Sequence, residues 1–178
     1  MSGQRVLIVD CDLRRPALHE ALGLDNRVGL VEMITGRVKF AQAHARDDRS
    51  RLIAVTAGGE VPNPADLLGS RYMSEFLDAA RENFDLVVLD SPPLMAVADA
   101  RVLASKVDRT VLAVRWAETR RDTVAMSLRH LAEIGAANIG VALTRVDSRK
   151  HAHYARGDSG YYHRVSVVKI IGTIEPVL

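Results

Sequence analysis

Short apolar runs alternate along this chain with longer stretches in which apolar residues recur every three or four positions. The short runs are rich in Val, Ile and Leu, as strands buried on both faces of a parallel sheet are. They predict strands at 5–9, 51–56, 86–89, 109–114 and 139–143. The longer stretches predict helices at 16–22, 29–35, 65–83, 96–105 and 119–134. This alternation is typical of an α/β fold with a doubly wound, mostly parallel sheet.

The pattern also divides the chain into two parts. Residues 1–147 carry the alternating pattern, and within 119–134 a stripe of four apolar residues at helical spacing should be buried: Val124, Leu128, Leu131 and Ile134. Residues 148–164 contain few aliphatic side chains, and 165–178 are apolar again. We therefore expect one domain over 1–147, and a flexible tail with a C-terminal arm over 148–178.

Composition narrows the class of protein. The 178 residues hold 24 basic and 22 acidic side chains, a net charge of +2, which argues against a dedicated nucleic-acid binder. The single cysteine, Cys11, cannot form an internal disulfide, so a reducing cytoplasmic setting is expected. No apolar run approaches the roughly 20 residues of a membrane span.

Two of the predicted strands end in acidic residues. Asp10 follows one strand, with Asp12 two positions later, and Asp90 follows another. Carboxyl ends of parallel strands meet at one edge of a sheet, where ligands bind, and carboxylates there could hold a magnesium ion on phosphate groups. An isolated Asp-x-Asp has an equally weighted structural interpretation, because acids at strand ends also cap helices or face water.

Three segments, 7–16, 62–70 and 84–93, resemble in order and spacing the cytoplasmic domain of bacterial tyrosine kinases, the capsular exopolysaccharide family. In that family the first segment is the Walker A' motif and the third is Walker B. The resemblance extends over about 5–162. It implies a P-loop NTPase-like fold similar to the ATPases of chromosome partition and septum placement, with ATP and Mg2+ as cofactors. The implied activity is an autophosphorylating protein-tyrosine kinase that regulates capsular or exopolysaccharide synthesis or export.

The resemblance also assigns roles near the acids. It makes Asp90 a metal-shell carboxylate, and it makes Asp10 and Asp12 the pair that holds the metal and takes the tyrosine proton, with Asp12 slightly favoured as the base. Arg14 would contact phosphate, or would equally well form a salt bridge to a neighbouring acid.

Further roles fall towards the C-terminus. Thr144 and Arg145 would lie at the nucleotide base, with Thr144 in place of an asparagine that reads the adenine edge, which should weaken discrimination between bases. Tyr154, Tyr161 and Tyr162 would be phosphoacceptors for a neighbouring subunit; the alternative is an exposed tail with incidental aromatic residues.

One family motif is missing. The phosphate loop Gly-x-x-x-x-Gly-Lys-Ser/Thr occurs nowhere in the sequence. The resemblance therefore leads us to expect a kinase domain truncated before Walker A', without the first strand and the phosphate loop, that binds ATP weakly by itself.

Partners and rival functions follow from the same resemblance. The implied partners are further copies of the chain and a transmembrane polysaccharide co-polymerase or membrane half, with no nucleic acid. The location would be cytoplasmic, membrane-associated through that partner or a missing N-terminal part.

Two rival functions stay open: a partition-type or septum-type ATPase, in which the acids would orient water, and a catalytically silent interaction module. A tyrosine cluster without a basic amphipathic helix favours the kinase.

Overall fold

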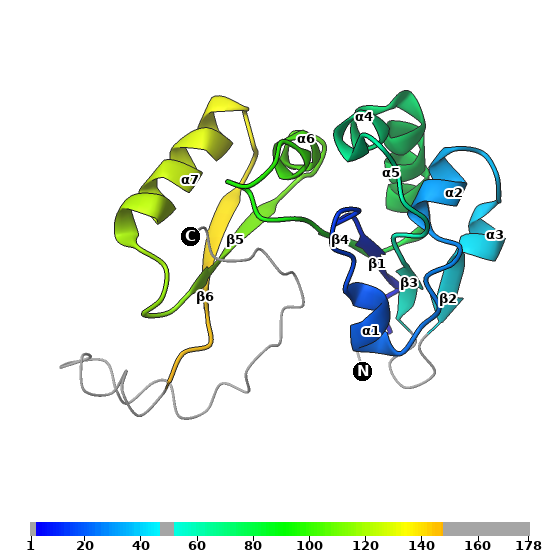
Figure 1. Ribbon diagram of the computed structural model, residues 1–178, viewed down its shortest axis with the longest axis horizontal. Coiled ribbons are helices and arrows are strands. Elements are labelled where there is room, and N and C mark those ends of the chain that lie inside the picture. The colour runs from blue at the N-terminus through cyan, green and yellow to red at the C-terminus, as the bar shows by residue number, and fades with distance from the viewer. Residues whose placement is uncertain (1–2, 47–51, 148–178) are drawn as a thin grey trace.

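The computed structural model describes residues 3–46 and 52–147 as alternating strands and helices (Figure 1). In chain order these are β1 (Val6–Asp10), α1 (Leu18–Leu22), α2 (Leu30–Ile34), α3 (Phe40–Ala43), β2 (His44–Arg46), β3 (Ile53–Val55), α4 (Pro64–Gly69), α5 (Arg71–Asn83), β4 (Leu86–Asp90), α6 (Asp99–Ala104), β5 (Thr110–Arg115), α7 (Arg121–Glu133) and β6 (Ile139–Thr144). The predicted domain of 1–147 contains all of them, whereas the predicted tail, 148–178, lies outside the described residues.

The described strands form two sheets. One has the order β2-β3-β1-β4, and the other consists of β5 and β6. Apart from β2, which runs antiparallel to β3, every pairing is parallel. The expected α/β class and mostly parallel pairing are therefore confirmed, but the described strands do not join into a single sheet, because β4 and β5 are not hydrogen-bonded to each other.

The strand β1 lies at the centre of the larger sheet. Its Leu7 and Val9 are fully buried in one apolar cluster with helices α2, α4 and α5, and Ile8 is buried on the opposite face against Leu18 of α1. A strand covered on both faces needs an uninterrupted apolar sequence, which explains the run before Asp10. Each such side chain contributes about 1.5–3 kcal/mol to folding. The cluster therefore fixes the strand end that carries Asp10.

A second cluster holds the smaller sheet. Leu112 and Val114 of β5 pack with Leu131 of α7 and with Ala100 and Ala104 of α6. The predicted stripe of α7 is confirmed: Leu131 is buried, and Val124, Leu128 and Ile134 are partly buried against it. In Figure 1, α7, β5 and β6 lie together, β1–β3 lie with α1–α5, and α6 is placed between the two groups, in contact with α4.

Several predicted boundaries were wrong. The helix expected over 65–83 is two helices, because Ser70 has extended backbone angles and its side chain accepts a hydrogen bond from Met73 N, so that it begins α5. The short α3 and β2 were not predicted. The remaining helices are shorter than expected by one to three residues at an end. None of the helices in the described part of the chain is both long and apolar enough to span a membrane.

Candidate functional site

The carboxyl edge of the larger sheet carries the predicted acidic residues. Asp10 and Asp90 are paired in register at the end of β1 and β4, so both side chains lie at the same edge. Asp10 is fully buried and Asp90 is 7% exposed. Cys11 follows Asp10 and donates its backbone N–H to Asp90 O at 2.7 Å, which extends the pairing by one residue.

Asp10 organises the loop that follows it. Its Oδ1 accepts a hydrogen bond from Asp12 N and its Oδ2 accepts one from Leu18 N, both at 3.1 Å. Leu18 is the first residue of α1, so Asp10 satisfies a helix N-terminal donor across the loop. Burial raises the pKa of the Asp10 carboxyl, and the backbone hydrogen bonds oppose that rise.

Asp12 is more accessible than Asp10. It is partly buried, and its Oδ1 accepts hydrogen bonds from Arg14 N at 3.2 Å and Arg15 N at 3.0 Å. This is the turn-capping interaction that a structural interpretation of Asp-x-Asp anticipates. Within the described residues, Asp12 Oδ2 has no hydrogen-bond partner. Of the two acids in the motif, Asp12 is therefore the one with an oxygen left to bind a ligand.

Arg14 forms a salt bridge. Its Nε and Nη2 donate to Oδ2 and Oδ1 of Asp99, at 2.7 and 3.2 Å. The side chain of Asp99 is fully buried at the start of α6, whereas that of Arg14 is 44% exposed. These hydrogen bonds raise the pKa of the Arg14 guanidinium. The sequence did not identify Asp99 as the partner, because 85 positions separate the two residues; an acid in the first turn of a predicted helix was the one available signal.

A second loop at this edge follows β3. Its Thr56 O and Ala57 O accept hydrogen bonds from Leu30 N and Val31 N, the first amides of α2, at 2.8 and 3.0 Å. Glu32, which is 9% exposed, accepts from Gly29 N at 2.9 Å and from Gly59 N at 3.2 Å. The loop after β3 therefore serves as the N-terminal cap of α2 and is held next to the acidic edge. Sequence reasoning missed Glu32, although an acid at the third position of a helix is a capping signal.

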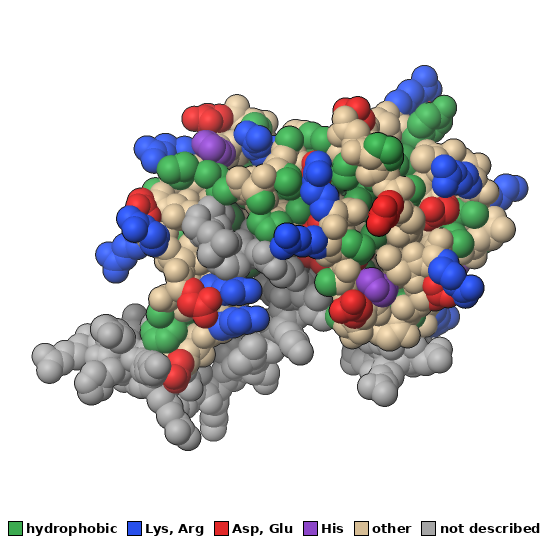
Figure 2. All heavy atoms as spheres, in the orientation of Figure 1, with side chains coloured by type: hydrophobic (Ala, Val, Ile, Leu, Met, Phe, Trp, Pro, Cys, Tyr) green, Lys and Arg blue, Asp and Glu red, His purple; other side chains and the backbone are tan. Residues whose placement is uncertain are grey.

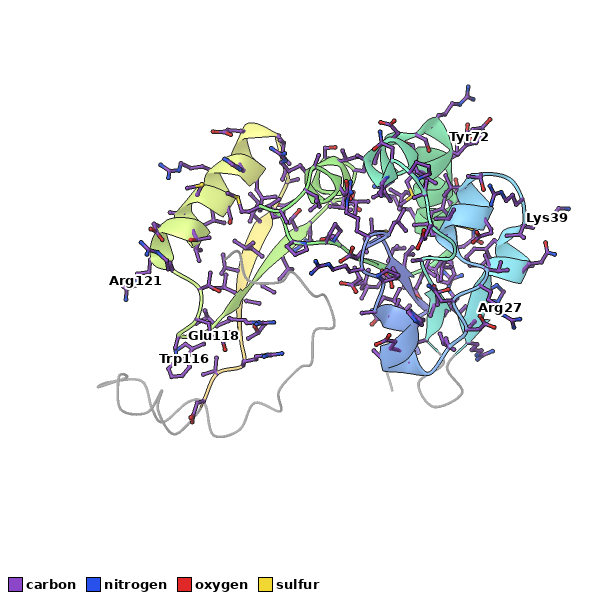
Figure 3. All side chains as sticks on the ribbon, viewed as in Figure 1. Arg27, Lys39, Tyr72, Trp116, Glu118 and Arg121 are labelled. Atoms are coloured by element: carbon purple, nitrogen blue, oxygen red, sulfur yellow. The ribbon has the colours of Figure 1, made fainter. Side chains whose placement is uncertain are left out.

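Thr144 and Arg145 lie elsewhere, at the carboxyl end of β6 in the smaller sheet. Thr144 is in register with Arg115 of β5, and the Thr144 carbonyl accepts a hydrogen bond from Trp116 N at 3.0 Å. The next residue, Arg145, is exposed and has a positive φ of 53°. Figure 3 shows Trp116 and Glu118 in the turn after β5. The structure thus brings Asp10, Asp12, Asp90 and Arg14 together on the larger sheet's side, and it leaves Thr144 and Arg145 on the other sheet.

The carboxylate side chains at the acidic edge are of the chemical type that binds Mg2+. Mg2+ prefers carboxylate oxygens, and it commonly uses one or two of them beside water and phosphate oxygens. Between residues 3 and 147, leaving aside 47–51, no group of three or more His, Cys, Asp or Glu side chains is arranged as a metal site. A site of one or two carboxylates is therefore what the described side chains offer. Tyr154, Tyr161 and Tyr162 lie outside the described residues.

A groove of about 760 Å³ lies away from these acids, between α2 and the α4–α5 region. Its walls are mostly apolar, and Tyr72, labelled in Figure 3, stands at its rim. Figure 2 shows basic and acidic side chains interspersed over the visible face. No predicted site residue lines the groove.

Comparison with known proteins gives relatives over most of the chain. The tyrosine-protein kinase YwqD of Bacillus subtilis is 34% identical over 90% of this chain and 65% of YwqD. The tyrosine-protein kinase wzc of Salmonella typhi is 32% identical over 89% of this chain and 22% of wzc. The chain thus spans less than two thirds of either relative. No protein-family model matches the sequence.

Solved structures also match this chain over most of its length. The VpsO kinase domain matches with a TM-score of 0.78 and 32% identity, over 82% of this chain and 72% of that domain. The septum site-determining protein MinD of Pyrococcus horikoshii, in complex with Mg-ADP, matches with a TM-score of 0.63 over 79% of this chain and 58% of MinD. At 18% identity the second match shows the fold alone.

Proposed function

This chain belongs to the family of bacterial tyrosine-protein kinases, and from that premise we propose that it is part of a protein-tyrosine kinase that uses ATP and Mg2+. The observation that carries the proposal is the pairing of Asp10 with Asp90 at one sheet edge, followed by a loop in which Asp12 keeps one carboxylate oxygen without a hydrogen bond to the described chain. Phosphoryl transfer needs a held metal, an oriented nucleophile and compensation of phosphate charge more than it needs covalent chemistry.

Each residue has a distinct task in this proposal. Asp90 would hold Mg2+ together with one carboxylate of the Asp10–Asp12 pair, and the ion would neutralise phosphate charge when bound. Asp10 belongs to the same metal-holding pair as Asp12, and its two backbone hydrogen bonds keep the loop in place. Asp12 Oδ2 accepts the proton of the tyrosyl hydroxyl, because a general base must offer a reachable lone pair. Thr144 and Arg145 contact the nucleotide base.

The substrates and partners extend the proposal. The acceptors would be Tyr154, Tyr161 and Tyr162 of a neighbouring copy, so the working form would be a homo-oligomer. The kinase would regulate capsular or exopolysaccharide synthesis or export, beside a transmembrane co-polymerase partner that brings it to the membrane. The name of a Klebsiella pneumoniae relative, a putative tyrosine-protein kinase in cps region, supports the polysaccharide link at 30% identity.

The rival functions have less support. The septum and plasmid-partition proteins that match in structure are 12–22% identical, whereas the matches that are kinase domains are 29–32% identical.

The test is phosphotyrosine formation. The chain, and the chain extended at its amino end by a Walker A segment, would be incubated with ATP and Mg2+ and analysed by mass spectrometry. Phosphate is expected on Tyr161 or Tyr162 in the extended chain, and Asp12→Asn should abolish it. Asp78→Asn, an exposed carboxylate on α5, is the matched control and should change nothing. ATP hydrolysis without phosphotyrosine would indicate the partition-type ATPase, and neither activity would indicate the silent module.

A further inference from the structure

Asp99 is an acidic residue in a buried, largely apolar environment. Its side chain is fully buried at the first position of α6, in the part of the molecule where α6 contacts α4 and where Ala100 and Leu103 are also buried. A lone carboxylate there would be strongly disfavoured, and the bidentate contact with Arg14 is what makes it tolerable.

Stability alone does not account for this pair. Removing the Asp99 carboxylate from water costs about as much as its attraction to Arg14 returns, so an apolar residue packed at position 99 could serve the fold as well. The pair does have a geometric effect that apolar residues could not reproduce. Two parallel hydrogen bonds, at 2.7 and 3.2 Å, fix both the position and the plane of the Arg14 guanidinium.

The Arg14 residue is in fact held at both ends. Its backbone N–H is bound by Asp12 Oδ1, and its guanidinium is bound by Asp99. Arginine has five N–H donors, and the contacts with Asp99 use two of them. The side chain is 44% exposed on the loop that carries Asp12, and within the described residues its guanidinium makes no hydrogen bond besides those to Asp99. A guanidinium fixed in this way is a preorganised binder of phosphate oxygens.

We propose that Asp99 is a positioning residue: it holds the guanidinium of Arg14 beside Asp12 so that the remaining N–H groups bind the phosphate chain of the nucleotide. This inference rests on the proposed kinase function and adds to it one residue, on α6, that the motifs do not contain. In this proposal the Asp99 carboxylate does not touch the phosphate chain; it affects phosphate binding only through Arg14.

The experiment measures by calorimetry the binding of inorganic pyrophosphate with Mg2+ to the chain extended at its amino end by a Walker A segment. Pyrophosphate carries the phosphate chain without base or ribose, so the readout is independent of Thr144, of Arg145 and of catalysis. Asp99→Asn should weaken binding at least about tenfold, since a charge-assisted hydrogen bond is worth roughly 1.5–3 kcal/mol. Arg14→Lys should weaken it to a similar degree, because lysine keeps the charge and loses the planar fork.

The double variant separates positioning from an independent effect. If Asp99 acts through Arg14, the variant with both substitutions should bind no more weakly than Arg14→Lys alone. Asp108→Asn is the matched control, because Asp108 is also the acidic partner of an arginine, Arg81, but its side chain is 83% exposed and lies away from Asp12 in sequence and fold. It should leave pyrophosphate binding unchanged.

Several outcomes would overturn the inference. They are failure of the extended chain without substitutions to bind magnesium pyrophosphate, unchanged binding in Arg14→Lys, or additive losses in the double variant. Should Asp99→Asn fail to fold, Asp99→Glu and Arg14→Lys keep the test decisive, because Asp99→Glu retains the ion pair and shifts the guanidinium, and Arg14→Lys retains the charge and removes the planar fork. Absence of phosphotyrosine with Asp99-dependent pyrophosphate binding would refute the kinase and leave this inference standing.

Discussion

Asp10 and Asp90 are the last register pair of the β1–β4 ladder, and both are buried beside the thiol of Cys11. Two carboxylates and a thiol thus share one strand end. Burial raises the pKa of the Cys11 thiol well above its usual value, and the charges of Asp10 and Asp90 raise it further.

Cys11 should therefore resist modification in the folded protein. A thiol is reactive as the thiolate, and here both the raised pKa and full burial oppose its formation and its contact with reagent. Titration with a disulfide reagent at pH 8 should show no fast reaction in the native chain and one equivalent after unfolding in guanidinium chloride. Rapid labelling of the native chain would mean that the Asp10–Asp90 edge opens readily.

The sequence was informative where the cause of structure is local. Apolar runs ending in acid predicted β1 and β4, and hence the shared edge of Asp10 and Asp90. Helical spacing predicted the buried stripe of α7. The pattern failed at Ser70, whose side chain accepts a single capping hydrogen bond from Met73 N and so starts a new helix inside an otherwise helical pattern.

Long-range pairs could not be predicted from these patterns. Nothing near Arg14 in sequence selects Asp99 over the other acids, since the contact depends on how α6 packs against α4. Likewise, Glu32 meets Gly59 because the loop after β3 caps α2, and that approach is a property of the assembled sheet. Residues that act through tertiary contacts were therefore missed, whereas the common edge of the two strand-end acids was predicted.

Replacing Glu32 by alanine should destabilise the chain. Its carboxylate accepts from Gly29 N and Gly59 N in a nearly buried position, and leaving these donors unpaired costs about 2–4 kcal/mol in total. Urea unfolding followed by circular dichroism measures the change in free energy of unfolding. Glu60→Ala removes an exposed carboxylate from the same loop and should change stability by no more than about 0.5 kcal/mol. Equal effects in the two variants would contradict the capping role of Glu32.

Gly29 tolerates no side chain. A Cβ at this position would lie 2.6 Å from Gly58 N and 2.7 Å from the carbonyl carbon of Thr56, both backbone atoms that cannot rotate away. We expect Gly29→Ala to lower the free energy of unfolding by about 3 kcal/mol or more, beyond ordinary overpacking of a core. The matched control is Gly140→Ala in β6, whose Cβ would meet nothing closer than Thr110 O at 4.0 Å. A neutral Gly29→Ala would show that the loop after β3 does not sit against α2 in solution.

The last prediction concerns acid pH. At the start of α7, Asp122 accepts hydrogen bonds from the Arg120 guanidinium and from Thr123 N, which lower its pKa to about 2. A carboxyl whose folded pKa lies below its unfolded value contributes stability above the unfolded pKa. That contribution should be lost as the pH falls from about 4 to about 2. Carboxyl chemical shifts followed by NMR should show Asp122 titrating near the lower value, and Arg120→Ala should move its midpoint upward. Because the pair is exposed to solvent, 0.5 M salt should also reduce the shift.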